Sequence, residues 1–117
     1  MLNQVVMVGR LTKDPEVEKT DNDKEVSNLT LAVPRSYKNA DGVYETDFID
    51  CVLWNGIATN TAEYCKKGDL IGIKGRIQSN TYETESGETK KSTQIVAEKV
   101  TFLSSKNQEK DNDDLSM

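Results

Sequence analysis

The chain has 117 residues, of which 35% are hydrophobic and 30% charged, and its formal net charge is -5. This length fits one domain with a modest core, and no apolar run is long enough to span a bilayer. Histidine is absent and the two cysteines lack CxxC spacing, which excludes a histidine-containing zinc site and a Cys-His nucleophile pair. We therefore expect no metal and no cofactor.

The negative charge is concentrated in two segments. Residues 14–25 carry a net charge of -4 and residues 104–117 carry -2, which leaves +1 for the remainder. Salt screens a surface field beyond about 8–10 Å, so an acidic total is compatible with a locally basic groove. The start, "MLNQVVMVGRL", lacks a basic region followed by a long apolar stretch. We expect a cytoplasmic protein in which Cys51 and Cys65 are buried, reduced thiols.

Turn residues separate five apolar runs, each of which predicts a β-strand. The acidic segment joins the first two runs, and we expect it to be a long loop. The turn signal "NADG" precedes the third run, and Gly87 marks a hairpin tip before the fifth. The strands are expected at residues 3–11, 25–33, 47–54, 69–82 and 92–103. Alternation in the fourth strand directs Ile71, Ile73 and Ile77 inward.

After the third strand the apolar period changes from two to three and four, which predicts a short helix at about residues 56–66. Asn55 is the expected N-cap, and Lys66, Lys67 and Gly68 are expected to close the other end. Three strands, a helix and two strands is the order of the OB-fold, a five-stranded Greek-key barrel.

The predicted fold is therefore an all-β OB-fold over residues 1–103, with one short helix between strands three and four. Gly72 and Gly75 support it, because a small closed barrel needs strands that coil sharply and let neighbours approach. Residues 104–117 lack periodicity and are highly polar, which predicts a short acidic disordered tail.

The third expected strand places two large rings and a carboxylate on one side. Alternation puts Phe48, Asp50 and Trp54 on one face and apolar residues on the other, which we expect to be buried. Tyr37 and Tyr82 are two further outward rings. Rings spaced along a groove stack on unpaired bases without reading their sequence, at about 1–3 kcal/mol per base. The alternative is that Phe48 and Trp54 belong to the core.

Eight basic residues lie around these rings and are candidates for neutralising phosphates, which would make affinity fall as salt rises. They are Arg35, Lys38, Lys66, Lys67, Lys74, Arg76, Lys90 and Lys91. The alternative is that they form an ordinary solvated surface.

The segments "MLNQVVMVGRLTKDPEV", "NLTLAVPRSY", "ETDFIDCVLWN", "YCKKGDLIGIKGRI" and "YETESGE" resemble the bacterial single-stranded DNA-binding proteins, in order and spacing, especially those of low-GC Gram-positive bacteria. The resemblance covers residues 1 to about 103. It implies an OB-fold, usually a homotetramer, that binds and protects single-stranded DNA in replication, recombination and repair. It also implies phosphate contacts from Lys66 and Lys67. The positions that match the family's base-stacking sites are Tyr37, Phe48, Trp54 and Tyr82.

The chain departs from this family at three places. Before Tyr82 it has "QSNT", where basic residues are common, and Asp50 stands where an arginine can occur, so we expect a shallower salt dependence. Family tails usually end in aspartates, Ile or Leu, Pro and Phe, a tip that recruits repair and replication enzymes. Here the end is "DNDDLSM", without Pro-Phe. The residues expected to bind such partners are Asp113, Asp114, Leu115 and Met117.

Other functions remain open at this point. A nuclease would need clustered acids such as Asp21, Asp23 and Glu25 to hold a metal, but these lie in a turn-rich segment with no candidate base or nucleophile. An interaction module could use the same barrel for a protein or an oligosaccharide, and a primosome-like accessory protein is a further candidate. We expect a binding protein and not an enzyme.

Overall fold

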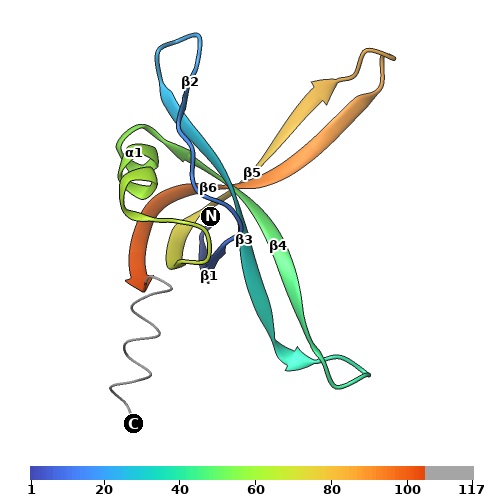
Figure 1. Ribbon diagram of the computed structural model, residues 1–117. Coiled ribbons are helices and arrows are strands. Elements are labelled where there is room, and N and C mark those ends of the chain that lie inside the picture. Colours follow the sequence, from blue (N-terminus) through green and yellow to red (C-terminus); the bar gives the residue numbers. More distant parts are fainter. Residues whose placement is uncertain (105–117) are drawn as a thin grey trace.

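The computed structural model describes residues 1–104, which form six strands and one helix (Figure 1). The elements are β1 (Val5–Leu11), β2 (Glu18–Lys19), β3 (Glu25–Lys38), β4 (Tyr44–Trp54), α1 (Asn55–Tyr64), β5 (Leu70–Glu83) and β6 (Thr89–Ser104). The predicted all-β class with one short helix is confirmed. Residues 105–117, including the expected partner-binding residues Asp113, Asp114, Leu115 and Met117, lie outside the described part.

Five of the strands close into a barrel, in the order β1-β5-β6-β4-β3. The barrel closes where β1 returns to β3, through the pairs Arg10 with Ala32 and Leu11 with Leu31. The other pairs of neighbouring strands are antiparallel except β4 and β6, which run parallel. This connectivity, with α1 between β4 and β5, is consistent with the predicted OB-fold.

The barrel interior is filled by aliphatic side chains and two buried, free cysteines. Burial is the main cause that raises the pKa of Cys51 to about 12 and that of Cys65 to about 11, with smaller contributions from the nearby acids Asp50 and Asp69. The core residues are Leu11, Leu29, Leu31, Cys51, Leu53, Ala58, Cys65, Ile71, Ile73, Ile95 and Ala97. None of the seven aromatic side chains of the chain is among them, and all seven are exposed.

Gly75 allows two strands to approach closely where β5 pairs with β6. A Cβ atom at this position would lie 2.1 Å from the carbonyl oxygen of Val96, a distance that real Cβ atoms do not reach. The register between the two strands shifts at the same place, after Lys74. Gly75 therefore has the role expected of it, because only a residue without a side chain fits here. Gly72 has no such contact, since its nearest neighbours lie 3.7 Å or more away.

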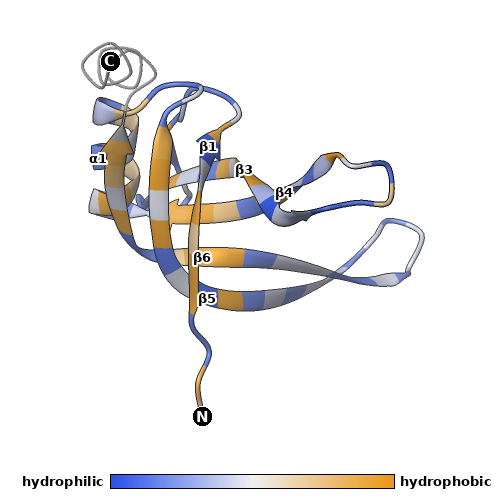
Figure 2. Ribbon diagram, turned by 90° about the horizontal axis from the view of Figure 1, so that it is seen from below, coloured by the Kyte–Doolittle hydropathy of each residue, from blue (hydrophilic) through white to orange (hydrophobic). Residues whose placement is uncertain are grey.

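Two pairs of strands extend beyond the barrel as arms, on the side away from α1 (Figures 1 and 2). The β3–β4 arm ends in the predicted "NADG" turn, where the Asn39 backbone N–H donates to the Val43 carbonyl at 2.8 Å and Gly42 has a φ of 79°. The β5–β6 arm ends in a turn in which the Thr84 backbone N–H donates to the Glu88 carbonyl at 2.8 Å. Figure 1 shows the two arms leaving the barrel in diverging directions.

The expected helix start is wrong. Asn55 was expected as the N-cap, but Trp54 occupies that position and makes no side-chain capping bond. Asn55 is the first helical residue, has a φ of 52°, and its side-chain oxygen accepts a hydrogen bond from the Glu25 backbone N–H at 3.3 Å. A tertiary contact to β3 has therefore taken the oxygen that a cap would have used.

The expected helix end is also wrong. The helix ends at Tyr64, before Lys66 and Lys67, and Gly68 donates its N–H to the Leu11 carbonyl at 2.8 Å. This glycine therefore joins the loop to β1 instead of capping the helix.

Three smaller expectations differ from the structure. The acidic loop contains the two-residue strand β2, which pairs with the start of β3. Strands β3, β4 and β6 are longer than expected, because the arms continue them past the barrel. Ile77, expected to point inward, is 46% exposed. It lies where β5 leaves the barrel, so its inward side no longer faces the core.

No helix in residues 1–104 is both long and apolar enough to cross a membrane.

Candidate nucleic-acid interface

The outer face of four adjacent strands carries the candidate site. Strand register places Ala32 opposite Phe48 and Thr30 opposite Asp50, so these side chains share one side of the β3–β4 pair. The parallel pair Val52 with Val96 continues this side onto β6, and the pair Gln78 with Gln94 continues it onto β5. We call this surface of β3, β4, β6 and β5 the outer face.

Three of the four predicted rings lie on the outer face. Phe48 is 66% exposed, Trp54 is 37% exposed and Tyr82 is 50% exposed, so the alternative that Phe48 and Trp54 belong to the core is wrong. Six residues of strand separate Phe48 from Trp54, which corresponds to about 20 Å. Phe48 and Trp54 are therefore too far apart to pack against one another.

Tyr37 lies on the other face of the β3–β4 arm. Its neighbour Lys38 places its Nζ 5.6 Å from the centre of the Tyr44 ring, and Tyr44 alternates in register with Phe48. Adjacent strand residues point to opposite sides, so Tyr37 points away from this ring. The sequence interpretation missed Tyr44. Extending the alternation upstream from Phe48 by four residues would have found it.

Arg35, a candidate phosphate contact, is held by two carboxylates of its own arm. Its Nη2 lies 2.9 Å from Asp47 Oδ1, and its Nη1 lies 2.5 Å from Glu45 Oε2. The hydrogen bond and the charge of Asp47 raise the pKa of Arg35, and the hydrogen bond from Arg35 lowers the pKa of Asp47. A phosphate would have to compete with these carboxylates, so Arg35 fixes the arm more readily than it binds DNA.

The other seven basic candidates are exposed but are not all on the outer face. Register and contacts place Lys38, Arg76 and Lys90 there, and Arg76 donates to the Gln78 side chain at 2.9 Å. Lys91 pairs with Thr81 and points to the opposite side of its arm. Those that lie apart from the rings are Lys66, Lys67, Lys74 and Lys91. Lys67 lies beside Asp14, whose carboxylate accepts its backbone N–H at 2.7 Å.

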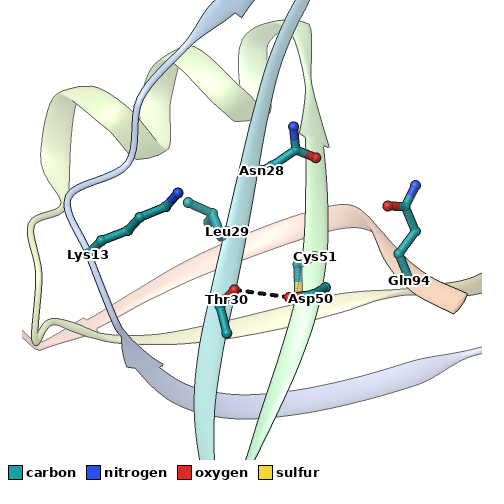
Figure 3. Close-up of a pocket in the computed structure, with 7 residues that line it drawn as sticks. All are labelled: Lys13, Asn28, Leu29, Thr30, Asp50, Cys51 and Gln94. Atoms are coloured by element: carbon teal, nitrogen blue, oxygen red, sulfur yellow. Dashed lines mark hydrogen bonds between the residues drawn. The ribbon is translucent and has the colours of Figure 1, made fainter. Parts of the chain in front are cut away.

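The outer face is hollowed in two places. One depression, of about 260 Å³, is lined by Phe48, Asp50 and Ile49 of β4, by Ile77 of β5, and by Thr93, Gln94 and Ile95 of β6. A second one of about 240 Å³ shares Asp50 and Gln94 with it (Figure 3). The sequence interpretation placed Ile77 inward and did not single out Gln94, because their exposure depends on where β5 and β6 leave the barrel.

The acids proposed for a nuclease do not form a metal site. Asp23 lies 3.5 Å from the Lys19 amine, and both side chains are largely exposed. Within residues 1–104 no group of three or more acidic or cysteine side chains is arranged to hold a metal ion.

Comparison with known proteins identifies relatives along nearly the whole described chain. The model of the "Single-strand binding protein family" matches residues 2–103. The chain is 49% identical over 110 residues to "Single-stranded DNA-binding protein B" of Bacillus subtilis, covering 94% of this chain and 97% of that protein. It is 50% identical over 107 residues to "Single-stranded DNA-binding protein A" of the same organism, covering 92% of this chain and 62% of that protein.

A third relative is "Single-stranded DNA-binding protein 3" of Listeria innocua, which is 51% identical over 106 residues. That match covers 91% of this chain and 66% of the Listeria protein. The chain therefore spans nearly all of one relative and under two thirds of the other two.

Proposed function

We propose that the outer face binds single-stranded DNA largely independently of the DNA sequence. The chain belongs to the single-strand binding protein family, whose members bind DNA and are not enzymes. Bases would stack on Phe48, Trp54 and Tyr82, and Tyr44 would extend the path along the β3–β4 arm. Phosphates would be neutralised chiefly by Lys38, Arg76 and Lys90. Tyr37 and the basic residues away from this face would contribute less.

The observation that carries this proposal is the exclusion of every aromatic side chain from the core. Large rings normally contribute the most to a small core, and exposing them forfeits that burial. Here seven rings are exposed, and three of the four predicted from the sequence share one face with two depressions. Flat, spaced, exposed rings fit unpaired bases, whereas a duplex keeps its bases stacked inside.

Trp54 fluorescence provides the direct test. Trp54 is the single tryptophan of the chain, so its emission reports on this site alone. We expect oligo-dT to quench it strongly, because a stacked base contacts the indole, and duplex DNA to leave it nearly unchanged. Equal quenching by both DNA forms, or none by either, would contradict the proposal.

The same titration at rising salt separates DNA from an oligosaccharide ligand. Three cations on the outer face predict a slope of log affinity against log salt of about -2, since each phosphate contact on a single strand contributes about -0.7. A slope near -6 would mean that all eight basic candidates act. An oligosaccharide would show almost no salt dependence, because no ions are released.

We also propose that the chain assembles as a homotetramer, in which β1 forms part of a contact between copies. In the described chain, β1 pairs with β5 over Val5–Arg10 and with β3 only at residues 10 and 11, so one edge of residues 5–8 has no partner strand. Val6 is 73% exposed and Val8 is also exposed. Figure 2 shows the hydrophobic colouring along this strand. An open edge with apolar side chains favours pairing with a second copy.

Replacing Val6 and Val8 together with glutamate is expected to break this contact, because it places four charges in a symmetric strand pair. Light scattering should then give a mass below that of the native assembly. Glu98→Lys, a charge change on an exposed residue of β6, should leave the mass unchanged. A native mass equal to that of one chain would contradict the tetramer proposal.

The cellular role proposed here is protection of single strands during replication, recombination and repair in the cytoplasm, at the nucleoid. The acidic end, with Asp113, Asp114, Leu115 and Met117, is proposed to bind basic surfaces of replication and repair proteins. A variant lacking residues 111–117 is expected to keep its affinity for oligo-dT and to lose those partners in a pull-down at low salt. If the shortened chain retained the partners, the proposed role of the acidic end would be contradicted.

A further inference from the structure

The smaller depression of the outer face is a polar pocket beside the ring path. It has a volume of about 240 Å³ and lies around Asp50, which shares the face of Phe48 and Trp54 and lies between them along β4. The residues that line it are Lys13, Asn28, Leu29, Thr30, Asp50, Cys51 and Gln94. Figure 3 shows Lys13, Asn28 and Gln94 around the Thr30–Asp50 pair. A base on the path between the two rings would meet this pocket.

The Asp50 carboxylate is held in place and still has acceptor capacity. Its Oδ1 accepts the Thr30 hydroxyl at 2.9 Å, and no other donor among residues 1–104 reaches the carboxylate. Oδ2 and the remaining lone pair of Oδ1 are therefore available. A carboxylate repels phosphate, so the group that binds here must offer N–H donors. In single-stranded DNA only the bases have them.

The four bases differ in the donors on their Watson–Crick edge. Guanine presents two adjacent donors, N1–H and the N2 amine, which match both oxygens of one carboxylate. Cytosine and adenine each present one amine beside an acceptor nitrogen. Thymine presents one N–H between two carbonyls, which a carboxylate repels. Lys13, Asn28 and Gln94 supply donors around the same pocket for the guanine O6.

We infer that this pocket prefers guanine at one position of an otherwise sequence-tolerant path, with Asp50 as the specificity residue. Thr30 is a positioning residue, because its hydroxyl donates to the carboxylate that would receive the base. The inference rests on the proposed function, since it needs single-stranded DNA to follow the outer face.

Deoxyinosine tests the inference, because its base differs from guanine only by the missing N2 amine. The full chain is titrated with oligo-dT tracts that carry one central dG, dI or dT, and binding is followed by fluorescence anisotropy of the labelled oligonucleotide. We expect the dG tract to bind about threefold to tenfold more tightly than the dI tract, the effect of one hydrogen bond to a charged acceptor at a partly exposed site. Equal affinity for dG and dI would overturn the inference while leaving the proposed function intact.

Three variants assign the effect to this pocket through the ratio of dG to dI affinity, which does not depend on overall affinity. Asp50→Asn should bring the ratio close to one, and Thr30→Val should lower it partly. Glu98→Gln removes an equal charge from an exposed position outside the pocket and should keep the native ratio. If Asp50→Asn kept the dG-to-dI affinity ratio of the native chain, the assignment of the guanine preference to Asp50 would be overturned. Failure of all tracts to bind would overturn the proposed function and this inference with it.

Discussion

Replacing Phe48 and Trp54 together with alanine is expected to lower the affinity for oligo-dT by roughly 30-fold or more. Each ring is expected to stack on one base, at about 1–3 kcal/mol, so the pair contributes about 2–6 kcal/mol. Both side chains are exposed and outside the core cluster, so the fold should survive their loss. Isothermal titration calorimetry with oligo-dT measures the change in affinity and does not depend on the fluorescence of the tryptophan that has been removed.

Tyr64→Ala is the matched control for this double variant. Tyr64 is 66% exposed, like Phe48, but it lies at the end of α1, where its ring centre is 5.9 Å from that of Phe102. Its removal is expected to leave oligo-dT affinity nearly unchanged, because α1 lies away from the arms (Figure 1). An equal loss of affinity in Tyr64→Ala and in the ring variant would contradict the stacking model.

Replacing Lys38 and Lys90 together should lower the oligo-dT affinity less than replacing Phe48 and Trp54 does. An equal or larger loss of affinity in the lysine variant would also contradict the stacking model.

Gly75→Ala is expected to have the largest effect on stability, a loss of about 3 kcal/mol or more in the free energy of unfolding. The added methyl would lie 2.1 Å from the carbonyl oxygen of Val96, and this neighbour is backbone, which has to move as a strand. Moving it disturbs the β5–β6 pairing that continues into the arm. Urea denaturation followed by far-UV circular dichroism measures the change.

Gly56→Ala is the control with the opposite expected sign. Gly56 lies in the first turn of α1, and a Cβ there would have no heavy atom within 4 Å. Alanine favours the helix and restricts the unfolded chain, so a gain of about 0.5–1 kcal/mol is expected. If Gly75→Ala were as stable as Gly56→Ala, the two strands would not be in the close contact described here.

The barrel could be predicted from sequence because its signals are local. Alternation in "DFIDCVLW" separates the exposed rings from the buried side chains, and the turn residues of the arms mark where strands reverse. The period change after the third expected strand correctly indicates α1. These signals depend on neighbours within a few residues, so the order of strands and helix along the chain and one face of the site follow from them.

The features that could not be predicted depend on contacts between distant segments. Asn55 binds the backbone of Glu25 instead of capping α1, and Ile77 is exposed because β5 has left the barrel at that point. Tyr37 has the expected exposure but lies on the other face, because the register pairs Ala32 with Phe48 and Tyr37 is an odd number of residues from Ala32. The sequence suggests that Arg35 is a cation available to phosphate, but in the structure Arg35 forms an ion pair with Asp47.

The exclusion of aromatic side chains from the interior has a practical consequence for optical work on this protein. Every chromophore that absorbs near 280 nm lies where solvent or a ligand can reach it. Near-ultraviolet signals will therefore report on what covers the surface and will be poor indicators of whether the aliphatic interior is intact. A sample could lose its packing with little change in tyrosine emission, so folding and ligand occupancy call for separate probes.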